Sequence, residues 1–566
     1  MTVELVGSGP GVAAVRAALE DVGSEVVARD VGDLGESDLA VVVGQAGDAV
    51  FERANEHALA VDLPWFAVEL GGVGSVPVTD AAVAGFGPDS GCYECLSGRV
   101  SANLDPDADP AAAPPAHTAR FAGAIAGREA ARYVAGGEAQ FGRVTEVPHA
   151  TREFLPLPDC ACGTRPERAL DRADADRDVE AALARAERAI DDRLGLVAEV
   201  GEAESFPAPY YLARTCDTAE FSDVSASREA AGVAPEWDAA FMKALGEGFE
   251  RYCAGVYRAG TFETGPPGAV PDAVLPSAFV CEGAPDADAE RGWVRGEDLA
   301  TGEHVHLPAE FVFYPPPAGE CRPPTTTGLG LGNSGVGALL AGLTEVVERD
   351  ATMLSWYSTF EPLGLSVADP EYETLAARAR SEDLSVTALL VTQDVDVPVV
   401  AVAVHREEWP AFALGSDADL DPARAARSAL AEALQNWMEL RGMGPERAGE
   451  ATGAIGRYAE FPPAVQSLVE PPSVVPAESV GPEDPPTGRA ALDAVLDALA
   501  AADMDAYAAR TTTRDVAQLG FEAVRVLVPR AQPLFFGDPY FGERAETVPA
   551  SLGFEPELDR EHHPFP

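Results

Sequence analysis

Paired carboxylates at helical spacing are the residues of this sequence best suited to chemistry. Glu345 and Glu348 lie three residues apart in the segment TEVVERDA, where apolar residues recur at the spacing of an α-helix. Side chains three apart project from nearly the same helix face, so these two like charges repel unless a cation lies between them. Mg²⁺, which binds one or two carboxylates together with phosphate oxygens, is the usual candidate. A single such pair could equally belong to a solvated acidic helix face.

Two further polar pairs repeat this spacing. Glu247 and Glu250 lie in LGEGFERY, and Glu432 and Gln435 lie in ARSALAEALQNW. Each pair lies in an Ala/Leu-rich segment that is predicted to be a helix. The glycine-rich stretch TTTGLGLGNSG precedes the pair described first, and a Gly-Ser dipeptide precedes the last. Pairs on three separate helices predict one convergent site.

In these segments the sequence resembles the YcaO family, whose members use ATP and Mg²⁺ to phosphorylate the oxygen of a peptide-backbone amide. The resemblance extends over roughly the last two-thirds of the chain, in GEGFERY, TTTGLGLGNSG with TEVVERDA, GSDADLDPARAARSALAEALQ and VRVLVPRAQPLF. It implies an ATP- and Mg²⁺-binding site made by Glu247, Glu250, Glu345, Glu348, Arg349, Glu432 and Gln435.

The resemblance also implies a reaction, that of an azoline-forming cyclodehydratase. A Cys, Ser or Thr side chain of a ribosomally made precursor peptide attacks the preceding amide carbon, and phosphorylation of the resulting oxyanion allows a five-membered ring to form. The products would be thiazole- and oxazole-type peptides such as bacteriocins, with a dehydrogenase as a further partner and a homodimer as the assembly. Thioamide formation from external sulfide, or a non-catalytic docking scaffold for the precursor peptide, are the alternatives.

Lys243 is the only lysine in the chain and lies four residues before Glu247, on the same predicted helix face. Its ammonium group could bind a phosphate as a point charge. It could equally neutralise Glu247 in an inactive site.

The chain ends in REHHPFP, which resembles the Pro-x-Pro-x-Pro end of azoline-forming YcaO proteins, a tail that runs back into the catalytic pocket. The resemblance implies catalytic roles for Pro564 and for the carboxylate of Pro566. His562 or His563 would help to move protons, because imidazole titrates near neutrality. The alternative is a frayed tail with two surface histidines.

Cysteine spacing predicts a structural zinc site. Cys92 and Cys95 form a CxxC motif, and Cys160 and Cys162 form a CxC motif. In a reducing compartment such pairs are more typical of metal ligands than of disulfides, and four thiolates match a closed Zn²⁺ site. The alternative is four unrelated thiols. The remaining cysteines are scattered and are expected to be core residues: Cys216, Cys253, Cys281 and Cys321.

The first residues predict a βαβ unit, in which the strand Thr2–Val6 is followed by the turn GSGPG, an Ala/Leu helix, and strands at EVVARD and DLAVVVG. The turn is a partial dinucleotide fingerprint, although glycines there could simply permit close packing. This part resembles the ThiF-like domain found beside YcaO domains. The predicted fold class is therefore an α/β, Rossmann-like (ThiF-like) docking domain with the zinc site over residues 1–165, and an α+β YcaO domain over residues 178–566.

The charge composition indicates the salt conditions in which the protein works. The chain carries 93 acidic and 40 basic residues, a formal net charge of −53, spread along its whole length. Such a surface repels itself in dilute buffer, and molar salt screens the repulsion. We expect a cytoplasmic protein of a salt-accumulating halophilic archaeon. The acidity argues against nucleic-acid binding, and the sequence shows neither a signal peptide nor a membrane-spanning segment.

Three segments are predicted to lie outside the regular elements. Asp105–Ala116 reads as an exposed loop and Pro462–Thr487 as a surface excursion, and the domain boundary is expected between Gly163 and Asp178. A helix is expected from Val179 onward, and an apolar strand at Val524–Pro529.

Overall fold

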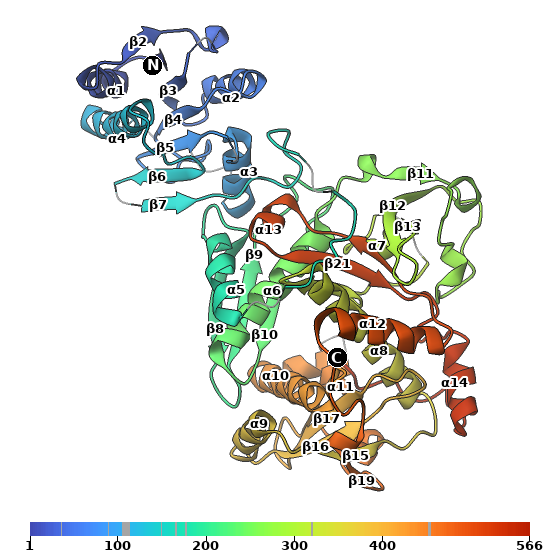
Figure 1. Ribbon diagram of the computed structural model, residues 1–566. Coiled ribbons are helices and arrows are strands. Elements are labelled where there is room, and N and C mark those ends of the chain that lie inside the picture. Colours follow the sequence, from blue (N-terminus) through green and yellow to red (C-terminus); the bar gives the residue numbers. More distant parts are fainter. Residues whose placement is uncertain are drawn as a thin grey trace.

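The computed structural model describes residues 1–35, 37–88, 90–104, 114–148, 150–164, 167–175, 178–317, 321–450 and 454–566 (Figure 1). Most of the predicted loop Asp105–Ala116 and part of the predicted boundary between Gly163 and Asp178 lie outside these residues. In the described part of the chain, no helix is long and apolar enough to cross a membrane.

A seven-stranded sheet, in the order β2-β1-β3-β4-β5-β6-β7, organises the first part of the chain. The first four strands in this order are parallel, which confirms the predicted βαβ connection, and the others are antiparallel. Helices α1 and α4 pack on one face, and α2 and α3 on the other. The elements are β1 (Thr2–Val6), α1 (Pro10–Asp21), β2 (Glu25–Ala28), β3 (Leu39–Gln45), α2 (Val50–Ala60), β4 (Trp65–Leu70), β5 (Ala81–Phe86), α3 (Tyr93–Asn103), α4 (Ala116–Val134), β6 (Arg143–Val147) and β7 (Ala150–Glu153).

Three further sheets follow, with orders β10-β9-β8, β11-β12-β20-β21-β14 and β18-β17-β16-β15-β19, and β13 pairs with β12. The elements are α5 (Val179–Ala186), β8 (Val197–Glu204), β9 (Tyr210–Thr215), β10 (Glu229–Val233), α6 (Trp237–Gly255), β11 (Glu263–Gly265), β12 (Arg291–Asp298), β13 (His304–Pro308), α7 (Ala309–Val312), β14 (Leu329–Gly332), α8 (Gly335–Trp356), β15 (Leu363–Ser366), α9 (Pro370–Arg380), β16 (Ser385–Leu390), β17 (Val399–His405), β18 (Phe412–Ala418), α10 (Pro422–Glu450), α11 (Ala454–Tyr458), β19 (Val474–Pro476), α12 (Gly488–Ala501), β20 (Tyr507–Arg510), α13 (Arg514–Gln518), β21 (Glu522–Leu527) and α14 (Arg544–Leu552).

Each of these three sheets supplies one strand that leads directly into a long helix. Strand β10 precedes α6, β14 precedes α8 and β18 precedes α10, and each helix packs against the strand before it. A glycine in each strand permits this close approach. A Cβ on Gly232 would lie 2.2 Å from the main-chain nitrogen of Ala244, and a Cβ on Gly330 would lie 2.2 Å from the main-chain oxygen of Ala338. A Cβ on Gly415 would lie 2.4 Å from main-chain atoms of α10.

Two of the cysteines that the sequence assigns to the core are joined by a disulfide. Cys281 and Cys321 are bonded, with their Cα atoms 5.1 Å apart. Cys321 is buried in an apolar cluster and Cys281 packs against it, so the expected core location is confirmed, and the bond between them was not predicted. The main-chain nitrogen of Glu282 donates to the oxygen of Cys321 at 3.0 Å, which holds the two segments together. Because the cysteines are 40 residues apart in sequence, their spacing does not reveal this proximity.

The segment Pro462–Thr487 is more integrated than predicted. Val474–Pro476 forms β19, which pairs in parallel with β15 at the edge of a sheet. Val465 and Ala477 of this segment are buried. Proline is tolerated at an edge strand, where no further ladder hydrogen bond is needed, so the proline content of the segment does not exclude a strand.

One apolar cluster joins the parts on either side of the predicted boundary. It includes residues of α2 and α3, and also residues of α5, α6 and α13. The boundary itself remains a prediction.

Candidate functional site

The three predicted pairs lie on α6, α8 and α10, the helices that follow the glycine-bearing strands. In each pair the first carboxylate accepts a hydrogen bond from a main-chain N–H. The donor lies in the strand that precedes the helix or, for Gly328, immediately before that strand. The bonds run from Ala231 to Glu247 (2.5 Å), from Gly328 to Glu345 (2.9 Å) and from Ser416 to Glu432 (2.7 Å). The same device therefore orients the first carboxylate of all three pairs.

Ser416 brings the pairs of α8 and α10 together. Its hydroxyl donates to Glu348 at 2.6 Å, while its main-chain N–H donates to Glu432. The pair of α6 lies near that of α8: the negative charge of Glu345 contributes to a raised pKa of Glu250. The structure thus groups the carboxylates of three helices around one region.

These carboxylates have unusual proton affinities. Burial, with a smaller contribution from neighbouring carboxylates, raises the pKa of Glu250 to about 8. Burial also raises the pKa of Glu345 and of Glu432 to about 7, although the positive charge of Arg349 opposes the rise in both. Removing water from several carboxylates at once stores electrostatic repulsion that a bound cation would relieve.

The spacing of the carboxylates limits how a cation could bind. In the described residues, the four cysteines are the only group of three or more potential ligands whose atoms all lie within 4.8 Å of one another. A Mg²⁺ ion here would therefore bind one or two carboxylates and complete its shell with phosphate or water oxygens, as Mg²⁺ commonly does. The donor set fits a magnesium–nucleotide complex better than a bare ion.

Cationic groups lie beside this cluster. Arg349 Nη1 is 3.4 Å from Glu348. Arg525 of β21 is buried, and its charge lowers the pKa of Glu250 and Glu345, while burial and the nearby Arg322 lower its own pKa to about 10. Arg525 lies within VRVLVP, so the motif contains it, but an arginine inside an apolar strand pattern gives no sign of where its side chain points.

Asp417 is a second site residue that sequence reasoning missed. It lies in β18, next to Ser416, and its pKa is raised well above the usual value by burial and by the charge of Glu348. The acidic segment GSDADLD contains it, and only the strand assignment shows which of its carboxylates faces the cluster.

Lys243 lies near carboxylates of β18 and α10. Its side chain is exposed, and its positive charge lowers the pKa of Asp417 and Glu432. Glu247 instead forms an ion pair with Arg251, four residues later on α6. The structure therefore gives no support to neutralisation of Glu247 by Lys243.

Gln435 lies at the edge of a cavity of about 600 Å³ beside the cluster. Its amide donates to Glu439 at 3.0 Å, and Glu439 also accepts a hydrogen bond from the hydroxyl of Tyr210 at 2.8 Å. Glu247 and Arg251 line the same cavity, together with Met438 and Leu212 among others. This volume is typical of small-molecule sites, and the mixture of apolar and charged walls suits a nucleoside.

The last residues pack against α8. Arg349 donates to the main-chain oxygen of Pro566 at 2.7 Å, which places the tail next to the carboxylate cluster. Pro564 and His563 are buried. The frayed-tail alternative does not describe this arrangement.

His563 does not have the properties expected of a proton shuttle. Its side chain is fully buried, and its Nε2 lies 2.7 Å from the main-chain oxygen of Phe535. Burial lowers the pKa of His563 to about 3, and the pKa of His562 is also lowered by burial. The expectation that the His563 imidazole titrates near neutrality is therefore wrong, because the folded tail excludes water from it.

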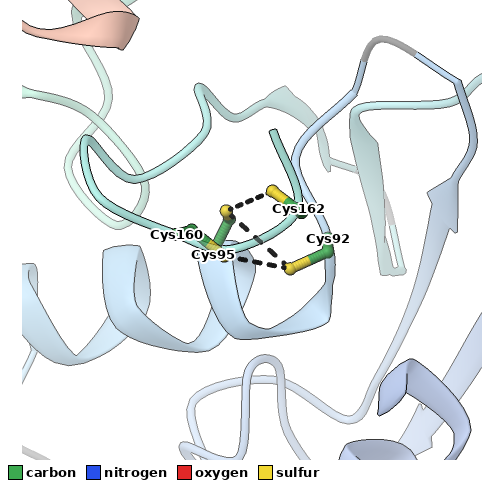
Figure 2. Close-up of side chains that lie close together, drawn as sticks. All are labelled: Cys92, Cys95, Cys160 and Cys162. Carbon is green, nitrogen blue, oxygen red and sulfur yellow. Dashed lines mark hydrogen bonds between the residues drawn. The ribbon is translucent and has the colours of Figure 1, made fainter. Parts of the chain in front are cut away.

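The four cysteines of the predicted zinc site converge (Figure 2). The Sγ of Cys92 is 3.5 Å from that of Cys160 and 3.9 Å from that of Cys95, and the Sγ of Cys95 is 3.5 Å from that of Cys162. Tetrahedral zinc with bonds of about 2.3 Å separates its sulfur ligands by about 3.8 Å. The arrangement fits a closed structural site, in which all four positions would be filled by protein.

The glycine turn near the start of the chain is explained by packing. A Cβ on Gly7 would lie 2.3 Å from the main-chain oxygen of Val43, and a Cβ on Gly123 of α4 would lie 2.2 Å from that of Gly11. Helix α4 thus lies directly against the turn. The glycines allow these contacts, which supports the packing alternative over bound dinucleotide.

Proteins of known structure share this architecture. Over its full fold, the chain is similar to a heterocyclase solved in complex with substrate and cofactor, with a TM-score of 0.73, 19% identity, and coverage of 98% of this chain and 83% of that one. It is also similar to the heterocyclase TruD, with a TM-score of 0.69, 20% identity, and coverage of 99% and 82%. At these identities the likeness establishes the fold.

Relatives found by sequence match a smaller part of the chain. An uncharacterised protein of Methanothermobacter thermautotrophicus is 29% identical over 205 residues, covering 34% of this chain and 53% of the relative. An uncharacterised protein in the tfuA 3′ region of Rhizobium leguminosarum bv. trifolii is 30% identical over 173 residues, covering 27% and 41%. The chain thus spans about half the length of these relatives or less.

The family profile described as YcaO cyclodehydratase, ATP- and Mg²⁺-binding, matches residues 231–532, more than half of the 566 residues. The match begins in β10 and ends after β21, so it contains all three carboxylate-bearing helices. The chain belongs to the YcaO cyclodehydratase family.

Proposed function

We propose that this protein is an ATP-dependent cyclodehydratase that converts Cys, Ser or Thr residues of a precursor peptide to azolines. The observation that carries the proposal is the arrangement of three strand–helix units, each with an oriented carboxylate, beside a cavity of nucleoside size. The raised pKa values of Glu250, Glu345 and Glu432 support a site that is completed by a cation.

In this proposal the nucleoside of ATP occupies the cavity lined by Gln435 and Glu247. One or two of Glu345, Glu348 and Glu432 would hold the magnesium ion, which would neutralise phosphate charge and align the transferring group. Lys243, which is exposed and near Asp417 and Glu432, would bind a phosphate as a point charge. Because the pKa values of Glu250, Glu345 and Glu432 are raised, binding of the cation would release protons from these carboxyl groups.

The chemical step places negative charge on an amide oxygen. The substrate side chain attacks the preceding amide carbon, the carbonyl oxygen becomes an oxyanion, and transfer of the γ-phosphoryl group from ATP turns that oxygen into a leaving group. The proton of the attacking thiol or hydroxyl is released to solvent as the new bond forms, and loss of phosphate and of the amide proton completes the ring. Arg349 and Arg525 provide positive charge beside the cluster for the developing oxyanion. Alignment of the side chain with the amide supplies much of the remaining acceleration.

The tail has a positioning role in this proposal. Because Arg349 holds the oxygen of Pro566, Pro564 and Pro566 form one wall of the region where the peptide would react, and buried His563 holds that wall against Phe535. Deletion of Pro564–Pro566 is expected to abolish ring formation while nucleotide binding stays within about twofold, measured by peptide mass and by calorimetry. Full ring formation by the truncated protein would remove the tail from the mechanism.

Residues 1–165 act in the proposal as a ThiF-like docking domain with structural zinc, and residues 178–566 as the catalytic domain. The cysteine cluster and the glycine-packed sheet give this first part a rigid surface for the precursor peptide. A dehydrogenase that oxidises azolines to azoles, a homodimeric assembly, and the cytoplasm of a salt-accumulating halophile complete the proposal.

The test is a reaction in molar KCl with Mg²⁺, ATP and a Cys/Ser/Thr-rich peptide encoded beside this protein. Azoline formation predicts one phosphate released and one water mass lost per ring. Replacement of oxygen by sulfur when sulfide is supplied would identify thioamide formation instead. Peptide binding without any nucleotide binding would identify a scaffold. Glu345→Gln serves as the inactive control.

A further inference from the structure

The zinc-site helix and the α6 helix of the nucleotide site meet at one buried side chain. Helix α3 carries Cys95 in its first turn, and Arg99 lies one turn later on the same face. The Arg99 side chain is completely buried, as are its partners Asp515 and Tyr252. A guanidinium group taken out of water in this way requires several partners, because an isolated buried charge is strongly unfavourable.

Arg99 first ties together the two halves of the cysteine cluster. Its Nε donates to the main-chain oxygen of Leu155 at 3.2 Å, and its Nη2 donates to that of Pro156 at 3.0 Å. These residues begin the segment that carries Cys160, and the next residue, Leu157, donates its main-chain N–H to the Sγ of Cys95 at 3.2 Å. The geometry of the cluster and the position of Arg99 are therefore linked.

Arg99 then reaches the part of the chain that holds the nucleotide site. Its guanidinium forms an ion pair with Asp515 of α13 and donates to the hydroxyl of Tyr252 at 3.3 Å. The same hydroxyl donates to Asp515 at 2.7 Å, so the three groups form a closed triangle. Tyr252 belongs to α6, two residues after Glu250 and five after Glu247.

A second contact joins α13 to the cysteine cluster. Arg514, adjacent to Asp515, donates to the Sγ of Cys162 at 3.3 Å. Helix α13 thus contacts both the cysteine cluster and Arg99, and it leads into β21, which carries Arg525. Because a helix moves as a rigid unit over one or two turns, a shift at Tyr252 displaces the carboxylates of α6.

We propose that Arg99, Asp515 and Tyr252 are positioning residues that couple the zinc site to the nucleotide site, so that zinc and magnesium–nucleotide bind with positive cooperativity. The inference rests on the proposed function for its nucleotide and on the fit of the cysteine cluster for its zinc. Coupling between sites is reciprocal, so each ligand raises the affinity of the other by the same factor.

Tyr252→Phe is the variant that isolates the coupling. It removes one hydroxyl from the triangle and keeps the buried ring and the Arg99–Asp515 ion pair. Other contacts still hold α3 to the remainder of the chain, such as the bond from the main-chain nitrogen of Asp217 to the oxygen of Ala102 at 2.9 Å. Tyr257→Phe is the matched control, because Tyr257 is also buried and its hydroxyl donates to Pro315 at 3.1 Å, away from Arg99.

The experiment measures zinc affinity of the full chain by competition with a chromophoric chelator, with and without Mg²⁺ and a non-hydrolysable ATP analogue. In the unmodified protein the nucleotide is expected to raise zinc affinity at least about fivefold. Tyr252→Phe is expected to bring this ratio close to one while both ligands still bind, and Tyr257→Phe is expected to preserve it. A purely structural role for the triangle would lower thermal stability without changing the ratio.

An unchanged ratio in Tyr252→Phe would overturn the inference, as would a ratio of one in the unmodified protein with nucleotide bound, or purified protein that binds no zinc. The first two outcomes leave the proposed function intact, and the third removes only its structural zinc. Absence of nucleotide binding would overturn the proposed function together with the inference.

Discussion

Two glycine-rich turns connect a strand to a helix in this protein, one between β1 and α1 and one between β14 and α8. At the first, Gly7 approaches the main-chain oxygen of Val43 so closely that a Cβ would lie 2.3 Å away. Just before the second, within β14, a Cβ on Gly330 would lie 2.2 Å from the main-chain oxygen of Ala338. By backbone geometry alone the two turns do the same thing.

The difference lies in what each turn faces. The first is covered by α4, whose Gly123 lies against Gly11. The second lies beside helix α8 with Glu345, which accepts a hydrogen bond from Gly328, and with Glu348. Glycine spacing therefore reports how closely two backbones approach, and the carboxylates spaced three apart mark the turn at which we propose that chemistry takes place.

The largest expected effect separates these two turns directly. Glu345→Gln and Glu348→Gln should each weaken binding of magnesium–nucleotide at least roughly tenfold, because each removes a charge that faces the cation. Gly9→Ala should leave the affinity within about twofold and lower the melting temperature slightly, since Gly9 has a φ of 93°. Isothermal calorimetry in molar KCl measures both. The reverse pattern would move the nucleotide to the first turn.

A pair of glycine substitutions sharpens the comparison. Gly330→Ala and Gly123→Ala each place a Cβ 2.2 Å from a main-chain oxygen, so each should cost about 1–3 kcal/mol in the free energy of unfolding. Only Gly330→Ala displaces a helix that carries site carboxylates, and it should also weaken nucleotide binding severalfold. Chemical denaturation and calorimetry on both variants give the two quantities. Equal losses of nucleotide affinity would contradict the distinction.

The pH dependence of nucleotide binding should arise from the carboxylates of α6, α8 and α10. Since the pKa of Glu250 is raised to about 8 and those of Glu345 and Glu432 to about 7, cation binding must release protons near neutrality. Magnesium–nucleotide affinity should rise from pH 6 to about pH 8 and level off above it. Calorimetry in buffers of different ionisation enthalpy would detect the released protons. A flat profile between pH 6 and pH 8 would show that these carboxylates do not face the cation.

The same shifts set the sign of a stability change. A carboxyl group whose pKa is raised by folding stabilises the folded state below its unfolded pKa, and this contribution is lost as pH rises through the folded value. Without Mg²⁺, stability should therefore fall between about pH 5 and pH 8, and Mg²⁺–nucleotide should restore it above pH 7. Thermal melts across this range provide the check.

The smallest expected effect is that of salt on the melting temperature, and it should be the same in all parts of the chain. The net charge of −53 is spread along the chain, so removing salt should lower the melting temperature by several degrees for α/β and carboxylate-bearing parts alike. Melts followed at several KCl concentrations test this. A melting temperature that is independent of salt would argue against the halophilic interpretation.

Local pattern was sufficient for much of this structure. Residues three apart in Ala/Leu-rich segments predicted α6, α8 and α10, and the cysteine spacing predicted a cluster that the structure brings together. The strand Thr2–Val6 and the helix after GSGPG were also predicted from periodicity. These features depend on neighbours in sequence, which is why they could be recognised.

Features that depend on distant contacts could not be predicted. The bond between Cys281 and Cys321 forms because two loops meet, and the pKa of His563 is low because the folded tail buries its side chain. The buried triangle of Arg99, Asp515 and Tyr252 joins residues more than 150 positions apart. Burial of a charge becomes visible only when its partners are in place.

The central claim, that this site activates a backbone amide with ATP, has one direct measurement. A precursor peptide labelled with ¹⁸O at the carbonyl of the reacting amide is incubated with the protein, Mg²⁺ and unlabelled ATP, and the released phosphate is analysed by mass spectrometry. Transfer of the amide oxygen to phosphate predicts one labelled phosphate for each ring formed, and none with Glu345→Gln. Ring formation accompanied by unlabelled phosphate, with the label released as water, would contradict the account.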